Sequence, residues 1–179
     1  KSLFLVPATG DLAGAEIELV GTDGRESMLR HLIESVAADF DYVIIDTGAG
    51  ISDNVVEAIR LANRALVVTA LEPTAVVDAY ALIKLMSTTD PAQEIEVVVN
   101  NAHDASEAQL VFAQLQVAAT RFLKRRIQYA GFIAHDPAVR ESVLVQRPIV
   151  DHLPQSPASR CFRILASRLA GAAAGRAAG

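Results

Sequence analysis

One aspartate stands where a carboxylate could serve a metal ion. Residues 41–50 read Asp-Tyr-Val-Ile-Ile-Asp-Thr-Gly-Ala-Gly, so an apolar run ends in Asp46 and is followed by Gly48 and Gly50. A carboxylate is costly to remove from water unless it gains a partner, and a hydrated magnesium ion is one such partner. The glycines would let the next loop approach a phosphate closely. Asp46 could equally cap a turn, and the stretch by itself fits both interpretations.

The elements that would position Asp46 follow from the pattern around it. An uninterrupted apolar run predicts a buried parallel strand, and open α/β sheets bind ligands at the carboxyl ends of such strands. Short β-branched runs predict strands over residues 3–7, 42–46, 65–69, 95–100 and 127–133. Helical periodicity and capping residues predict helices over about 25–38, 54–62, 73–86, 105–123, a short stretch after Asp136-Pro137, and 158–169. Alternating strands and helices predict an α/β fold, a mostly parallel sheet with helices on both faces in three layers.

Composition limits the classes of function. The 179 residues are 51% hydrophobic and fit a single globular domain over residues 1–170, followed by a flexible Ala/Gly-rich tail over 171–179. A net charge of −5 argues against a nucleic-acid binder that works through overall charge. Cys161 is the only cysteine, so no intrachain disulfide can form, which favours a reducing cytoplasm.

A phosphate-binding loop is missing from the chain. Such a P-loop reads Gly-x-x-x-x-Gly-Lys-Ser/Thr, and none of the lysines, Lys1, Lys84 and Lys124, stands in that context. The chain begins at Lys1 without a methionine, directly before an apolar run. We therefore expect an amino-terminal truncation that removes a P-loop strand and helix.

The motifs in their order resemble the MinD/ParA family of deviant-Walker P-loop ATPases. Residues 41–50 resemble the family's Walker B and second switch region, and Glu-Pro-Thr at 72–74 resembles the branch of flagellar-number regulators (FlhG- and YlxH-like proteins). Residues 97–100, Val-Val-Val-Asn, resemble the strand end that reads adenine, and residues 129–136 resemble a later strand with its acidic loop. The resemblance covers about residues 3–170 and implies a MinD-like P-loop NTPase fold.

The resemblance implies roles for the switch residues. Asp46 would be the catalytic and metal-associated residue, because it would order magnesium through water and couple the switch to the γ-phosphate. Thr47, Gly48 and Gly50 would form the switch loop that follows. An ordinary strand-to-helix turn explains the glycines as well, and it does not exclude the switch role.

Two further positions would lie at the nucleotide base. The amide of Asn100 offers a donor and an acceptor, the pair that the N6 and N7 edge of adenine requires; Asn100 could instead be a turn residue. Asp136 would lie in the base loop by resemblance, whereas its position before Pro137 favours a helix N-cap. Ala134 stands where the family often has a proline, which puts the base contact of this loop in question.

The implied function is an ATP- and magnesium-dependent molecular switch that forms a homodimer and controls flagellar number and placement. Implied partners are the flagellar signal-recognition-type GTPase and switch-ring proteins, without direct nucleic-acid binding. Some relatives carry a carboxyl-terminal amphipathic helix, so peripheral contact with the inner membrane stays open. Two alternatives also stay open: a non-catalytic partner-binding relative, and a P-loop synthetase that activates a carboxylate with ATP, although no cluster of extra substrate-binding groups is visible.

We expect the 179-residue chain alone to hydrolyse no ATP, because it lacks the lysine and glycines that cradle the phosphates. Phosphate release with ATP and magnesium should equal that of a protein-free blank. Clear magnesium-dependent turnover by this chain would contradict the expectation.

Overall fold

The computed structural model describes residues 25–48 and 50–177. By its internal contacts the chain divides into two compact units, Lys1–Asp46 and Thr47–Gly179. The predicted strand at 3–7 lies outside the described residues.

The first unit contains the helical segment expected from the sequence. Helix α2 spans Arg25–Val36, and a short 3-10 helix, η1, follows at Ala37–Asp39. The predicted strand over residues 42–46 is wrong, because these residues form neither helix nor strand. Val43 and Ile44 are 42% and 88% exposed. A strand exists only through a hydrogen-bonded ladder, and no described strand pairs with this segment, so apolar composition alone did not suffice.

The second unit is built on three parallel strands. They are β1 (Arg64–Thr69), β2 (Glu94–Ala102) and β3 (Gln128–Ala134), in the order β1-β2-β3. Val67 of β1 lies opposite Val97 of β2, which lies opposite Tyr129 of β3. These strands confirm the predictions over 65–69, 95–100 and 127–133.

Helices make the crossovers between the strands. Helix α4 (Pro73–Thr89) joins β1 to β2, with proline in its first turn. Helix α5 (Ala105–Ala118) and a π-helical segment, η2 (Ala119–Leu123), join β2 to β3. Asp104 caps α5 by accepting a hydrogen bond from the Glu107 amide at 2.9 Å, as its position predicted. Helix α3 (Asp53–Leu61) precedes β1.

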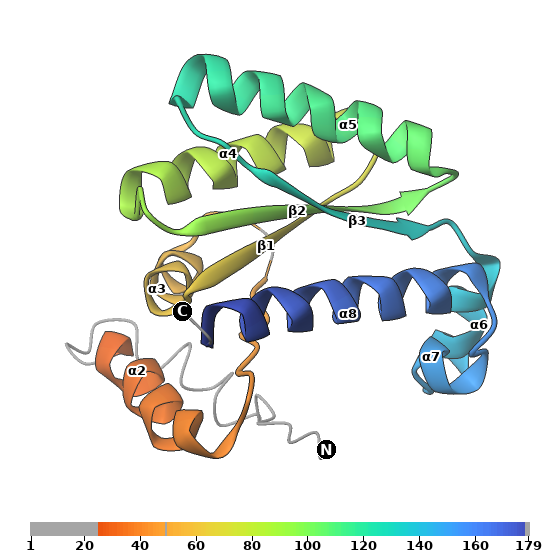
Figure 1. Ribbon diagram of the computed structural model, residues 1–179, viewed down its shortest axis with the longest axis horizontal. Coiled ribbons are helices and arrows are strands. Elements are labelled where there is room, and N and C mark those ends of the chain that lie inside the picture. The colour runs from red at the N-terminus through yellow and green to blue at the C-terminus, as the bar shows by residue number, and fades with distance from the viewer. Residues whose placement is uncertain (1–24, 49, 178–179) are drawn as a thin grey trace. The chain divides into compact units, whose positions relative to one another are not determined.

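Apolar side chains bury both faces of the sheet. Val97 packs in a cluster with Ile83 of α4 and Leu115 of α5, whereas its neighbour Val98 packs with Ala158 of α8. Successive strand residues point to opposite faces, so α4 and α5 cover one face and α8 (Pro157–Ala177) covers the other, as Figure 1 shows. This arrangement confirms the predicted α/β fold with helices on both faces of a parallel sheet.

The carboxyl-terminal segment is more helical than expected. Helix α6 (Pro137–Leu144) follows Asp136-Pro137 as predicted, and a four-residue helix α7 (Ile149–His152) comes after it. Helix α8 runs to Ala177, beyond the expected end near residue 169. Within the described residues, no helix has both the length and the apolar content needed to cross a bilayer.

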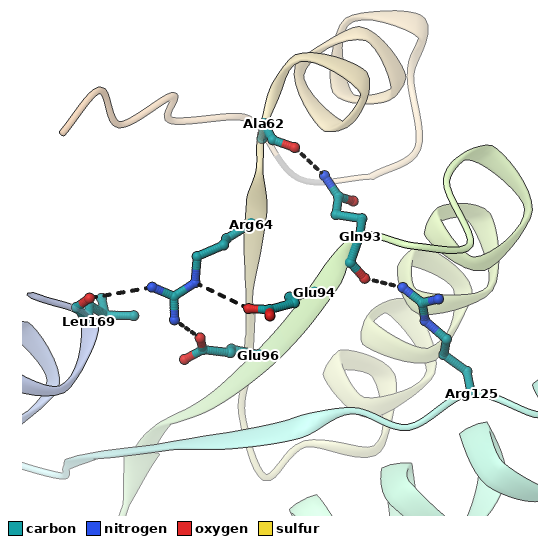
Figure 2. A network of polar contacts seen from close by, with 7 residues as sticks. All are labelled: Ala62, Arg64, Gln93, Glu94, Glu96, Arg125 and Leu169. Carbon is teal, nitrogen blue, oxygen red and sulfur yellow. Dashed lines mark hydrogen bonds and ion pairs between the residues drawn. The ribbon is translucent and has the colours of Figure 1, made fainter. Parts of the chain in front are cut away.

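An ion pair links two strands at the amino-terminal end of the sheet (Figure 2). Arg64 of β1 forms an ion pair with Glu96 of β2, whose side chain is only 6% exposed. The Arg64 Nε lies 3.8 Å from Glu94 Oε2, and its Nη1 donates to the carbonyl of Leu169 at 3.3 Å. One guanidinium therefore joins two strands and α8.

Gln93 extends this network to two other segments. Its side-chain nitrogen donates to the carbonyls of Ile59 at 2.7 Å and Ala62 at 2.8 Å, at the end of α3. The backbone carbonyl of Gln93 accepts a hydrogen bond from the guanidinium of Arg125, in the segment before β3, as Figure 2 shows. These bonds hold the start of β2 to the end of α3 and to the entry of β3.

One carboxylate caps two helices at the opposite end of the sheet. Asp136 Oδ1 accepts from the Ala138 amide of α6 at 3.0 Å, and its Oδ2 accepts from the Ala158 amide of α8 at 3.1 Å. The amide of Ala158, followed by that of Ala138, holds the pKa of Asp136 below its usual value. The structure thus confirms the expected N-cap and adds a second capped helix.

We expect Arg64→Met to lower the free energy of unfolding by about 3 kcal/mol, because it leaves a buried carboxylate without its cation. The double change Arg64→Met with Glu96→Met should recover most of that loss, since a buried pair and an apolar replacement are often similar in stability. Urea unfolding followed by circular dichroism measures both.

Glu94→Gln provides the matched control, because Glu94 faces the same guanidinium with a side chain that is 39% exposed. Loss of the Glu94 charge should lower the free energy of unfolding by less than about 1 kcal/mol. If Glu94→Gln and Arg64→Met lowered the free energy of unfolding equally, the burial of Glu96 would not explain the effect of Arg64→Met.

We expect Asp136→Ala to destabilise the fold by roughly 2 kcal/mol at neutral pH, about 1 kcal/mol for each lost cap. Asp136→Asn keeps one acceptor oxygen and should lose about half as much. The lowered pKa means that the carboxylate's contribution is complete above the unfolded-state value of 3.8 and disappears as the pH falls through the folded-state value. The difference in unfolding free energy between wild type and Asp136→Asn, measured in urea, should therefore shrink from neutral to acidic pH. A difference that persists in acid would contradict the cap assignment.

Candidate functional site

The candidate site lies where the carboxyl ends of the three strands meet. Ligands of open α/β sheets bind at this edge. Thr69 ends β1 and is buried, and its hydroxyl donates to the carbonyl of Ala75 at 3.1 Å. Residues 100–102 end β2, and His135 and Asp136 follow β3 directly. The edge therefore presents side chains mainly from β2 and from the segment after β3.

Asn100 presents an exposed amide at this edge. It lies within β2, which runs two residues beyond the predicted end to Ala102. Its side chain is exposed, and no hydrogen bond to it is found among the residues that the structure describes. An amide without an internal partner keeps both its donor and its acceptor available for a ligand.

Asn101 has an unusual backbone and a defined partner. Its φ is 61°, in the left-handed region that asparagine tolerates better than most residues. The β2–β3 register shifts between Val99 and Ala102, and the His135 amide donates to the Ala102 carbonyl at 2.8 Å. This irregularity brings Asn101 Oδ1 to 2.8 Å from His135 Nδ1.

A second imidazole lies beside the first. The ring centroids of His103 and His135 are 5.6 Å apart, with 30° between the ring planes. Glu107 Oε2 accepts from the His103 amide at 2.9 Å and lies 3.0 Å from His103 Nδ1. The backbone amide of His103, followed by its imidazole, lowers the pKa of the Glu107 carboxyl. Each histidine is thus held through Nδ1 by an oxygen.

Asp136 lies at the same edge as Asn100, but its carboxylate already serves α6 and α8. Both oxygens accept backbone hydrogen bonds at 3.0 and 3.1 Å. Releasing the carboxylate to a ligand would leave two helix ends without their caps. The structure therefore gives Asp136 a capping role and leaves its predicted base contact as an expectation.

The switch residues lie in the segment that precedes α3. Asp46 ends the first unit and is exposed, and Thr47 and Gly48 begin the second, also exposed. Gly50 has a φ of 102°, a backbone conformation that residues other than glycine rarely adopt. Among the described residues other than the direct chain neighbours, no atom would lie within 4 Å of a Cβ at Gly48 or Gly50. The backbone conformation at position 50 thus favours glycine, whereas the space around it would admit a side chain.

Each unit offers one group that suits part of a nucleotide. In the second unit the exposed amide of Asn100 suits a base edge, and in the first unit the exposed carboxylate of Asp46 suits a hydrated ion. In the part of the chain that the structure describes, no three acidic, histidine or cysteine side chains gather to hold a metal ion directly. The phosphate cradle has no counterpart in this sequence.

The sequence did not predict the cluster of Asn101, His103 and His135 at the carboxyl edge of the sheet. The histidines at 103 and 135 are 32 positions apart, with α5 and β3 between them, so no spacing rule connected them. Parallel pairing of β2 with β3 brings them together. The one available signal was Asn101 in the pair Asn-Asn at a strand end, because asparagine favours left-handed backbone.

Comparison with known proteins identifies the family. The model of an AAA domain family matches residues 1–101, more than half of the chain. The antiactivator FleN of Pseudomonas aeruginosa is 38% identical over 134 residues, which are 75% of this chain and 48% of FleN. The flagellum site-determining protein YlxH of Helicobacter pylori is 29% identical over 79% of this chain and 47% of its own length.

The fold agrees with these sequence relatives. The MinD cell division protein of Aquifex aeolicus superposes with a TM-score of 0.63 and 25% identity, over 78% of this chain and 58% of that one. MinD of Bacillus subtilis is 28% identical over 94% of this chain and 59% of its own length. The chain spans about half the length of the flagellar relatives that it matches. It belongs to the MinD/ParA family of P-loop ATPases, in the branch of the flagellar-number regulators.

Proposed function

We propose that this chain provides the base-reading and switch portion of an ATP-dependent molecular switch that regulates flagellar number and placement. The observation that carries the proposal is the exposed Asn100 amide at the carboxyl edge of a parallel sheet. Nucleotides bind at such edges, and an amide matches the donor and acceptor of adenine.

Asp46 would act through magnesium. Bound Mg²⁺ with ATP supplies positive charge that offsets the negative charge of the phosphates. The exposed carboxylate of Asp46 would hold a water of that ion, and Thr47 would begin the loop that responds to the γ-phosphate. Gly50 lets this loop take a conformation that a side chain would oppose. Asp136 would keep the base segment in place by capping two helices.

The switch would act through association. We propose that ATP favours a homodimer and that hydrolysis returns the monomer, a two-state response to the γ-phosphate. The names of two relatives, an antiactivator and a flagellum site-determining protein, support a flagellar role. Partners would be the flagellar signal-recognition-type GTPase and switch-ring proteins, in the cytoplasm or at the inner membrane. One solved structure with a similar fold is a complex of MinC with MinD from Aquifex aeolicus, which supports partner binding as part of the proposal.

The proposal is tested on the protein expressed from its complete gene. Binding of a fluorescent ATP analogue with magnesium should weaken about tenfold in Asn100→Ala, the size of a lost hydrogen-bonding pair. Asn63→Ala is the matched control, because Asn63 is also exposed but lies before β1, at the other end of the sheet. It should bind like wild type.

Association is measured in the same protein by sedimentation. Non-hydrolysable ATP should produce a dimer that ADP does not, and Asp46→Ala should remain monomeric with either nucleotide. Deleting the gene should change the number of flagella per cell. Altered flagella without any ATP binding would instead favour the non-catalytic partner-binding alternative, and unchanged flagella would remove the flagellar role.

A further inference from the structure

The outer face of α5 lacks the charges that an exposed helix face usually carries. α5 lies along one outer side of the second unit, as Figure 1 shows. Residues 108–120 contain no charged side chain. Leu110 and Val117 are nevertheless 67% and 64% exposed, and Ala113 and Gln114 between them are exposed as well. Because a helix face in water normally carries charged residues, this face has the composition of one that packs against another element.

The exposed residues form one seam along the helix. Leu110, Ala113 and Val117 recur at intervals of three and four positions, the spacing that places side chains on one side of a helix. Ala113 is small and stands between two larger side chains, so a second helix can approach the backbone closely at that point. The name α5 seam is used below for Leu110, Ala113, Gln114 and Val117.

The two ends of the α5 seam carry opposite charges. Asp104 and Glu107 precede it, at the amino end of α5. Arg121, Lys124 and Arg126 follow it and are exposed, and no acidic residue stands between Glu107 and these cations. Charges of these signs suit the dipole of α5. The dipole does not explain why the face between them is uncharged and partly apolar.

We propose that the α5 seam pairs with the α5 seam of a second copy of this chain, in antiparallel orientation about a two-fold axis. Leu110 and Val117 are equally distant from the middle of the seam. A two-fold axis through that middle sets Leu110 of each copy against Val117 of the other. The small Ala113 then lies where the two helices cross, so the apolar side chains of both copies are buried together.

The charges at the ends select the antiparallel orientation. The same axis brings Glu107 of one copy within one helical turn of Arg121 of the other, and it brings Asp104 close to Lys124 in the same way. Each acidic end therefore meets a basic end, and both contacts occur twice. A parallel pair would set acids against acids and cations against cations, which is unfavourable.

This surface is separate from that of the proposed nucleotide-dependent dimer. The nucleotide would bind at the carboxyl edge of the sheet, whereas the α5 seam lies on a helix that covers one face. Only one helix from each copy takes part, and interfaces below about 1,200 Å² in total are weak. We therefore expect pairing at protein concentrations on the order of 100 µM or higher, above those at which the nucleotide-dependent dimer is measured. A second surface of this kind would link such dimers where they are locally concentrated.

A charge swap across the seam tests the antiparallel register. Sedimentation is measured with ADP on the protein expressed from its complete gene, from about 10 µM to about 1 mM, which brackets a weak interface. Wild type should change from monomer to dimer over this range. Leu110→Lys and Val117→Glu should each raise the dissociation constant about tenfold or more, because each sets a charge against an apolar side chain. The double change should recover most of the affinity, since it sets a lysine against a glutamate at both places.

Ile164→Lys is the matched control. Ile164 is 69% exposed but belongs to α8, which covers the opposite face of the sheet. This variant should associate like wild type. Because ADP replaces ATP throughout, failure of the ATP-dependent dimer would not alter these results.

Two outcomes would overturn the inference. One is a wild-type protein that stays monomeric at about 1 mM, which is above the range expected for a weak interface. If Leu110→Lys then also lowered the urea midpoint of unfolding while Ile164→Lys did not, another part of the same protein would be what covers the seam. The other outcome is a double variant that associates no better than either single variant, because an antiparallel pair in this register requires recovery.

Discussion

The structure depends on the backbone ladder that places β2 between β1 and β3. β2 pairs in parallel with both neighbours, and its side chains are buried on both faces of the sheet. The part of the candidate site around Asn100 follows from this strand. Asn100 and Asn101 are its last polar residues, and the amide of His135 continues its pairing with β3 beyond the regular register.

The two ends of β2 carry different chemistry. At the amino end, Glu96 is buried with Arg64, and Gln93 joins the end of α3 to the segment before β3. These charges and amides are used within the protein, so they stabilise the sheet. At the carboxyl end, Asn100 is exposed with no internal partner among the described residues. An end whose polar groups bond mostly within the protein and an end whose amide is exposed are the arrangement that a binding site on an open sheet requires.

Sequence patterns predicted local structure where local chemistry decides it. The proline at 73 and the acids at 104 and 136 started their helices as expected, because capping is decided within a few residues. The segment 42–46 shows the limit of such reasoning, since its apolar run becomes a strand only with a pairing partner. The cluster of Asn101, His103 and His135 was not predictable, because a crossover and a register shift create it. The dual role of Asp136 likewise depends on α8, whose start lies 22 residues further along the chain.

We propose that the carboxyl edge of this sheet reads an adenine base. The most direct measurement is a crystal structure of the protein expressed from its complete gene, with magnesium and a non-hydrolysable ATP analogue. We expect the adenine amino group to lie within hydrogen-bonding distance of the Asn100 amide, with Asp136 still capping α6 and α8. An ATP base bound away from Asn100, or a protein that binds its partners with no nucleotide at this edge, would contradict the claim.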